Sequence, residues 1–236
     1  MDKKDIIKEK YNKLAGNYDK ILSVKKLWGK ICCKVIWGFK DTEYTEELLK
    51  WLPDDFSGKL LDIPAGTALF TLEKYRKMKN ADIVCMDYSQ NMLEMAKEKF
   101  KQNDLNNIEC IQGDVGNLPY EDETFDLVLS MNGIHAFPDK EKAFTEIKRV
   151  LKNNGIFIGC FYIKGIMKRT DWFINNIYKR SGTFTPPFYT KSEIILKFDK
   201  EYKELVLWNA GSIICFKCIK IQARIEVQKG VFPLIS

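Results

Sequence analysis

The stretch Lys59–Phe70, KLLDIPAGTALF, constrains the fold of this chain more than any other. A short apolar run ends at Asp62 and leads into Pro-Ala-Gly-Thr, after which the sequence can begin a helix. This order predicts a buried strand, a tight loop and a helix N-terminus. In an open α/β sheet, ligands bind at the C-terminal edge of the strands beside the topological switch point. Asp62 is therefore a candidate ligand-binding residue.

Two more apolar runs end in the same way. The run Ile83–Met86 is followed by Asp87, and the run Ile108–Ile111 is followed closely by Asp114. Three consecutive strands would then each bring a carboxylate to one edge of the sheet. The spacing predicts a site that hydrogen-bonds an amine, a ribose and an adenine.

Strands and helices alternate from Gly58 onward, which is typical of a mostly parallel sheet with helices on both faces. We expect strands at 59–63, 82–86, 107–111, 125–131 and 155–162, with helices at about 67–77, 90–102 and 138–151. The near-continuous apolar character of the strands favours a sheet that is buried on both sides.

The two ends of the chain follow other patterns. Residues 2–52 are predicted to be helical, including a helix at Glu43–Leu52. After Tyr162, residues 163–190 predict a helix and a loop over the C-terminal edge of the sheet. A helix at Ser192–Phe198 follows, and then two strands, Glu201–Trp208 and Ser212–Ile221, that form an antiparallel hairpin at the sheet edge. Residues 222–236 fit no pattern.

Composition excludes several classes of protein. The formal net charge of +6 arises from 38 basic and 32 acidic residues that are scattered, which favours a solvated surface over a nucleic-acid-binding face. The N-terminus lacks the apolar core of a signal peptide, and no run reaches the roughly 18 apolar residues of a membrane span. We therefore expect a cytoplasmic protein without a membrane-spanning segment.

The seven cysteines do not suggest a metal site. Most lie in apolar, strand-like runs, where cysteine behaves as a small hydrophobic residue. Cys215 and Cys218 form a C-x-x-C pair, but strand residues three apart point to opposite faces. Since there is one histidine and no second pair, we expect no metal, and the cysteine usage fits a reducing cytoplasm.

The loop after the first strand argues against a dinucleotide. A dinucleotide fingerprint needs three glycines so that the backbone can approach a pyrophosphate. Here only Gly66 is present, Pro64 lacks an amide donor, and Ala68 stands where another glycine could be. A ligand with a ribose and an amino-acid tail but no phosphate fits better.

With these features in place, the chain resembles class I S-adenosylmethionine-dependent methyltransferases of the type-11, ubiquinone/menaquinone methyltransferase-like group. The resemblance runs from about Gly58 to Phe161 and rests on four stretches in order, with YNKLAGNYDKI resembling the family's entry helix. The family usually reads D-x-G-x-G-x-G, and this chain departs from it at Pro64 and Ala68. The four stretches are LLDIPAGTALFTLE, VCMDYSQNMLEMAKEK, IQGDVGNLPYEDETFDLVLSMNGIHAFPD and AFTEIKRVLKNNGIFI.

The resemblance implies a Rossmann-like class I methyltransferase fold: one domain with a mostly parallel seven-stranded sheet, an antiparallel edge hairpin and helices on both faces. Within residues 1–236 it implies a helical N-terminal lid at 1–57, a cofactor-binding core at 58–162, a lid insertion at 163–190, and a C-terminal hairpin and tail at 191–236.

The resemblance also assigns the loop after the first strand to S-adenosylmethionine. Asp62, Ala65 and Gly66 would line the methionine end of this cofactor, with Pro64 and Thr67 in the same loop. The alternative for Asp62 is a cap of the following turn.

The second and third strands would hold the nucleoside. Asp87 would accept hydrogen bonds from both ribose hydroxyls, which suits a carboxylate with two oxygens. Tyr88 and Met92 would flank the adenine, while Asp114 and the backbone of Val115 would contact its amine. The alternatives are a helix cap for Asp87, although Ser89 suits that role better, a turn for Asp114, and packing for Tyr88 and Met92.

The remaining assignments concern the fourth strand and the lid. Met131 and Asn132 would contact the amino acid of the cofactor through backbone atoms, and Tyr18 would close over it or pack in the core. His135 follows the fourth strand and is a candidate catalytic base, with packing or a loop hydrogen bond as the alternative.

We therefore expect methyl transfer from S-adenosylmethionine to a small, apolar or aromatic acceptor. Aromatic residues of the lid segments would line its pocket, and Lys164, Lys168 and Arg169 would either attract an anionic group or be solvated. The alternatives are a non-catalytic protein that binds S-adenosylmethionine and an RNA methyltransferase. After the fourth strand, Met131-Asn132-Gly133-Ile134 lacks the N/D-P-P-Y/F motif of DNA-adenine and protein-glutamine enzymes.

Overall fold

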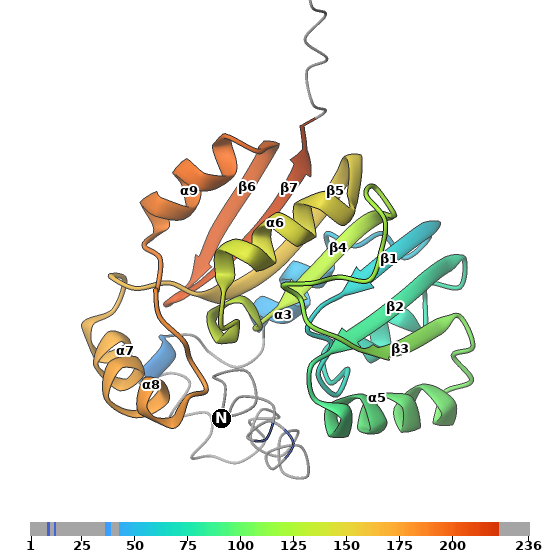
Figure 1. Cartoon of the computed structure of the whole chain (residues 1–236), viewed down its shortest axis with the longest axis horizontal. Helices are drawn as coiled ribbons and strands as arrows, with labels where there is room; N and C mark the ends of the chain where they lie inside the picture. Colours follow the sequence, from blue (N-terminus) through green and yellow to red (C-terminus); the bar gives the residue numbers. More distant parts are fainter. Residues whose placement is uncertain (1–8, 10–11, 13–35, 39–42, 222–236) are drawn as a thin grey trace, which may run out of the picture.

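A seven-stranded sheet with helices on both faces forms the described part of the chain (Figure 1). The computed structural model describes residues 9, 12, 36–38 and 43–221. Among these residues the strand order is β3-β2-β1-β4-β5-β7-β6. This arrangement confirms the predicted Rossmann-like sheet.

The first five strands are mutually parallel. They are β1 (Gly58–Asp62), β2 (Ala81–Asp87), β3 (Ile108–Gln112), β4 (Phe125–Met131) and β5 (Leu151–Tyr162). From β1 the chain runs outward through β2 to β3, then returns to β4 on the other side of β1. The topological switch point therefore lies between β1 and β4, and the ends of these two strands form its rim.

The start of β5 was predicted too late in the chain. Leu151 already pairs with Phe125, and the register then shifts so that Leu127 lies beside Ile156. A bulge with Asn154 at φ +60° absorbs the extra residues. Residues 151–154, which precede the predicted strand, thus form the first part of an irregular strand.

The C-terminal hairpin is confirmed. Strands β6 (Tyr202–Ala210) and β7 (Ile213–Lys220) pair antiparallel, and β7 pairs antiparallel with β5. Cys215 and Cys218 pack into hydrophobic clusters on opposite faces of the sheet, as expected for strand residues three apart. Among the described residues, no group of three or more histidine, cysteine or acidic side chains could hold a metal ion.

Helices α3, α4 and α5 contribute to the hydrophobic cluster on one face of the sheet, and α6 and α9 to the cluster on the other. Strand side chains alternate between the two clusters, Leu60 in one and Leu61 in the other. Both are fully buried, so the sheet is covered on both sides. The helices are α3 (Glu43–Leu49), α4 (Leu72–Tyr75), α5 (Gln90–Gln102), α6 (Lys140–Val150) and α9 (Lys191–Asp199).

Local capping explains where the longer helices begin. Ser89 caps α5 by accepting a hydrogen bond from the Met92 amide, and Asp139 caps α6 in the same way. Thr190 and Glu193 form a capping box at α9. The predicted helix at 67–77 was wrong in extent, because Ala68 takes a positive φ and only 72–75 are helical.

The segment after β5 contains α7 (Lys168–Phe173), a π-helical turn, η3 (Ile174–Tyr178), and α8 (Lys179–Ser181). A 3₁₀ turn, η2 (Ile134–Ala136), follows β4. None of the helices in the described ranges combines the length and the apolarity needed to cross a bilayer. The predicted N-terminal helices lie largely outside the described residues, and α3 confirms the helix expected from Glu43, three residues shorter.

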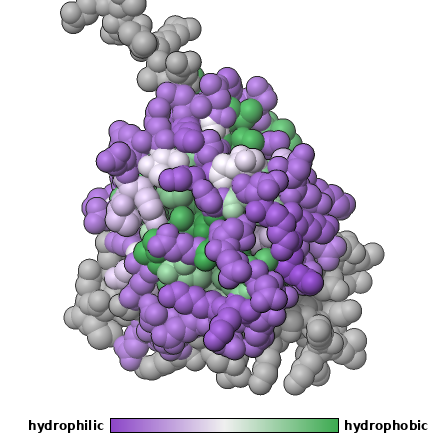
Figure 2. All heavy atoms as spheres, turned by 90° about the vertical axis from the view of Figure 1, so that its right-hand side faces the viewer, coloured by the Kyte–Doolittle hydropathy of each residue, from purple (hydrophilic) through white to green (hydrophobic). Residues whose placement is uncertain are grey.

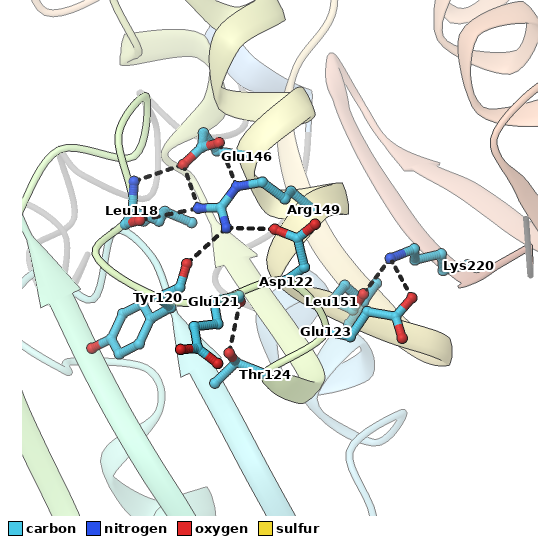
Figure 3. Close-up of polar contacts among 10 residues, drawn as sticks. All are labelled: Leu118, Tyr120, Glu121, Asp122, Glu123, Thr124, Glu146, Arg149, Leu151 and Lys220. Carbon is cyan, nitrogen blue, oxygen red and sulfur yellow. Dashed lines mark hydrogen bonds and ion pairs between the residues drawn. The ribbon is translucent and has the colours of Figure 1, made fainter.

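Arg149 in α6 fixes the loop that leads into β4 (Figure 3). Its guanidinium pairs with Glu146 and Asp122 and donates hydrogen bonds to the carbonyls of Tyr120 and Leu118. One planar cation thus ties three groups of the β3–β4 connection to α6. These contacts fix the position of the β3–β4 connection, which begins directly after β3.

Candidate functional site

A pocket lies at the switch point and is lined by the loops that follow β1, β2, β3 and β4. The structure brings twelve of the residues predicted from sequence into its lining: Asp62, Pro64, Ala65, Gly66, Thr67, Asp87, Tyr88, Met92, Asp114, Val115, Met131 and Asn132. Tyr18 lies outside the described residues. His135 is described but does not line the pocket.

Asp62 ends β1 with its carboxylate almost fully buried. The Tyr75 hydroxyl donates a hydrogen bond to its Oδ2 at 2.8 Å. Burial raises the pKa of Asp62 to about 7, and the Tyr75 hydrogen bond opposes this rise. A cationic group entering the pocket would stabilise the ionised form of this carboxylate.

Asp87 ends β2 and faces the loop after β1. Its Oδ2 accepts a hydrogen bond from the Gly66 amide at 2.8 Å, and its Oδ1 accepts one from the Ser89 amide at 2.8 Å. Burial raises the pKa of Asp87 to about 6, against these two hydrogen bonds. Because Ser89 caps α5, Asp87 is not needed as the cap. Each carboxylate oxygen retains a lone pair for a ligand hydroxyl.

The two departures from the family loop have local structural consequences. An added Cβ on Gly133 would lie 2.0 Å from the Cδ of Pro64, so Gly133 is what allows the β4 loop to approach this proline. Ala68 is buried and takes φ +55°, a conformation that glycine adopts without strain. Gly66, at φ +56°, has open space where a side chain would be.

Asp114 both closes a turn and lines the pocket. Its Oδ1 accepts a hydrogen bond from the Gly116 amide at 2.9 Å, and Asp114 forms a backbone bridge with Asn117. The turn alternative from sequence is thus present together with the pocket position. Val115 and Met92 are buried beside it and give this part of the pocket apolar walls.

Asn132 ends the β4 side of the switch point in a strained conformation. It takes φ +55°, which is uncommon for residues other than glycine and recurs at functional sites. Its Oδ1 accepts a hydrogen bond from the Tyr44 hydroxyl of α3 at 3.2 Å, and its amide donates to the Cys160 carbonyl at 2.8 Å. Tyr44 is a supporting residue that sequence reasoning missed.

His135 is buried behind the pocket lining. Its ring stacks on Phe184 with 3.9 Å between centroids, and its Nδ1 accepts a hydrogen bond from the Tyr162 amide at 3.3 Å. Burial lowers the pKa of His135 to about 3, so the imidazole is neutral at physiological pH. These contacts match the packing alternative, and a catalytic role for His135 stays a prediction.

Sequence reasoning also missed part of the lining itself. Their position in the sequence could have identified several of them, because these residues directly follow β4 at the switch point. Most are apolar, and the additional residues are Ile63, Ala68, Leu69, Phe70, Thr71, Gly113, Gly133, Ala136, Phe137 and Pro138.

The electrostatics of the pocket suit a cation with apolar parts. Its ionisable side chains among the described residues are three aspartates and Tyr88, with no lysine, arginine or histidine. A phosphate would meet carboxylates there instead of donors. This set of hydrogen-bond acceptors and negative charges therefore fits S-adenosylmethionine, which carries a sulfonium, an ammonium and two ribose hydroxyls, better than a dinucleotide.

Comparisons with known proteins agree with this geometry. The methyltransferase domain family matches residues 61–159. A demethylmenaquinone methyltransferase from Staphylococcus saprophyticus is 28% identical over 209 residues, covering 86% of this chain and 79% of that protein.

Two solved structures share the fold. A possible histamine N-methyltransferase from Thermotoga maritima, described as S-adenosylmethionine-dependent, has a TM-score of 0.64 at 18% identity and covers 90% of this chain and 99% of its own. Phosphoethanolamine N-methyltransferase 2 from Haemonchus contortus, in complex with S-adenosylmethionine, has a TM-score of 0.64 at 16% identity. The match covers 83% of this chain and 57% of that protein. Residues 61–159 therefore match the type-11 methyltransferase domain, and this match, the relatives and the shared fold support a class I S-adenosylmethionine-dependent methyltransferase.

Proposed function

We propose that this enzyme transfers the methyl group of S-adenosylmethionine to a small, apolar or aromatic molecule. The observation that supports this proposal most strongly is that the pocket residues other than the carboxylates are mostly apolar. Where the chain leaves β4, the lining consists of Met131, Ala136, Phe137 and Pro138, and Phe70 joins it from the β1 loop. Such walls bind an apolar ring and offer a polar or charged acceptor few partners.

The carboxylates divide the pocket into two parts. Asp62 and Asp87 supply negative charge near the loop after β1, where the cofactor would lie. When bound, S-adenosylmethionine supplies an electrophilic methyl group on a sulfonium. Asp87 would hold the ribose, and Met92 and Val115 would hold the adenine between apolar side chains. The apolar residues after β4 would then hold the acceptor.

The residues of the pocket contribute mainly by positioning. Methyl transfer is an in-line displacement, and holding two reactants in the reactive geometry supplies roughly 7–11 kcal/mol of the barrier reduction. The described lining contains no histidine or lysine that could remove a proton from the acceptor. An acceptor that needs deprotonation would therefore have to reach the pocket already as an enolate or phenolate, with its charge facing the sulfonium of the cofactor, because the lining offers it neither a base nor a cation. The name of the Staphylococcus relative supports an acceptor of the quinone type.

The proposal is tested first by cofactor binding. Isothermal titration of the full chain with S-adenosylmethionine and S-adenosylhomocysteine is expected to show micromolar affinity. No binding of either compound would contradict the assignment of the pocket.

The second test measures transfer of a labelled methyl group to four acceptor classes: a short-chain demethylmenaquinol analogue, a naphthol, a small amine and a transfer RNA. We expect product with the aromatic acceptors. Phe137→Ala should raise the KM for the acceptor and leave the affinity for S-adenosylmethionine unchanged, and Phe137→Leu should restore most of the loss. Turnover of the RNA alone, or of the amine alone, would contradict the proposal.

A further inference from the structure

The segment 163–182, which we call the basic insert, concentrates positive charge on its surface. It carries five basic residues and one acid, Asp171, within a chain whose formal net charge is +6. All five basic side chains are exposed: Lys164, Lys168, Arg169, Lys179 and Arg180. The carboxylate of Asp171 accepts hydrogen bonds from the Tyr162 hydroxyl of β5 at 2.6 Å and from the Gly165 amide of the basic insert at 2.9 Å.

The same surface exposes large apolar side chains. Trp172 is 58% exposed, Ile177 47% and Ile166 44%. Thr170 and Ile174 are four residues apart and fully buried, so they mark the inner side of α7 and η3. Trp172 lies between them in sequence and therefore on the opposite, outer side of the helix. Lys168 lies one turn before Trp172 on that outer side.

The rest of the described surface has a different character. The side of the molecule beyond β3 and α5 is predominantly hydrophilic around a smaller apolar area (Figure 2). Of the described residues, every large hydrophobic side chain that is exposed lies after Tyr162, and three of the seven belong to the basic insert. The combination of lysine and arginine with exposed tryptophan and isoleucine is thus particular to this part of the chain.

We propose that the outer face of the basic insert binds the surface of an anionic lipid bilayer. An exposed tryptophan with basic residues on both sides of it in sequence fits the membrane interface, where its ring lies at headgroup depth and each cation is attracted by anionic lipid. Nucleic acid would satisfy the cations but would leave Ile166 and Ile177 without a suitable partner. The inference concerns attachment to a surface and does not depend on the acceptor of the methyl group.

The test uses the full chain and vesicles of phosphatidylcholine with and without phosphatidylglycerol, without cofactor or acceptor. Co-sedimentation should require the anionic lipid and should weaken at high salt, because salt screens surface charges. Changing Lys168, Lys179 and Arg180 together to alanine should weaken binding about fivefold for each charge removed. A matched variant with Lys79, Lys97 and Lys101 changed to alanine loses the same charge elsewhere and should bind normally.

A second pair of variants tests the apolar contribution. Trp172→Ala should weaken vesicle binding several-fold, whereas Leu196→Ala, which removes a 65% exposed leucine on α9, should not. Wild-type emission should shift to shorter wavelength on anionic vesicles, and Trp172→Phe should lose most of that shift while still binding.

Three results would overturn the inference: no binding to anionic vesicles, equal weakening by both triple variants, or insert-dependent binding to poly(U) RNA without binding to vesicles. Because methyl transfer is not measured here, none of these results bears on the proposed function.

Discussion

The loops that follow β1 to β4 differ from the chain after Tyr162 in where they place charged and apolar side chains. In the loops, the carboxylates of Asp62 and Asp87 are buried and the walls around them are apolar. After Tyr162, charges are exposed and large hydrophobic side chains remain in contact with solvent. The first arrangement encloses a small ligand, while the second presents a surface.

This difference shows that the residues of the pocket loops are constrained by the ligand that they enclose, whereas the exposed residues after Tyr162 are constrained by what their surface contacts. A buried carboxylate costs stability unless a ligand or donor compensates for its desolvation, so its position in the sequence is informative. An exposed tryptophan such as Trp172 has a smaller cost and can vary with whatever the surface contacts. The comparison leads to five predictions, which follow from the largest expected effect to the smallest.

Substitutions of Asp87 and Asp171 are expected to give the largest contrast between the two regions. Both carboxylates accept backbone amide hydrogen bonds, one in the pocket and one in the basic insert. Asp87→Ala should lower the affinity for S-adenosylmethionine about 10³-fold, since two charge-assisted hydrogen bonds to ribose are lost. Asp171→Asn should leave this affinity unchanged. Calorimetric titration of both variants measures the contrast, and retained affinity in Asp87→Ala would refute the assignment of the ribose site.

Two glycines give the second contrast. Gly133→Ala should destabilise the fold by about 3 kcal/mol, because its new methyl group would collide with the Pro64 ring. Gly165→Ala in the basic insert meets no atom within 4 Å and should cost about 1 kcal/mol through its positive φ alone. Denaturant unfolding at constant m-value measures both.

A double-mutant cycle isolates the contact between Pro64 and Gly133. Pro64→Gly restores the residue that the family usually has and removes the ring that Gly133→Ala would meet. In that background Gly133→Ala should lose most of its cost. Equal costs in the two backgrounds would show that the proline and the glycine are not coupled.

The pH dependence of stability tests the buried charge of the pocket. Because the pKa of Asp62 is raised in the folded state, to about 7, that state binds more protons than the unfolded chain between pH 4 and 7. The contribution of Asp62 to stability is therefore most favourable at low pH and decreases as the pH rises toward 7. For Asp62 alone the loss from pH 5 to 7 is about 2 kcal/mol. Asp62→Asn should flatten the curve by this amount in unfolding experiments without cofactor, and an unchanged slope would contradict the assignment.

Sequence patterns predicted many residues of the pocket lining because each strand of β1 to β3 is an apolar run that ends near an aspartate. The physics of a parallel sheet then places these ends at one edge. The patterns did not predict that Tyr44 of α3 contacts Asn132, since this contact joins residues 88 positions apart. They left a catalytic role and a packing role for His135 both open, because its partner Phe184 comes from the segment after β5. Long-range packing of this kind has no local signature.

Ala68 provides the smallest and most local test, because it holds a non-glycine residue where the family usually has glycine. Ala68→Gly relieves the strain of φ +55° but loses a buried methyl group and makes the unfolded chain more flexible, so its net effect on stability should be within about 1 kcal/mol. Ala68→Val adds a β-branched side chain in the same conformation and should cost clearly more. Thermal unfolding of the two variants compares them. If valine were tolerated as well as glycine, the backbone at residue 68 would not have the left-handed conformation, and the loop would not need a glycine-like residue to position Gly66 and Asp87.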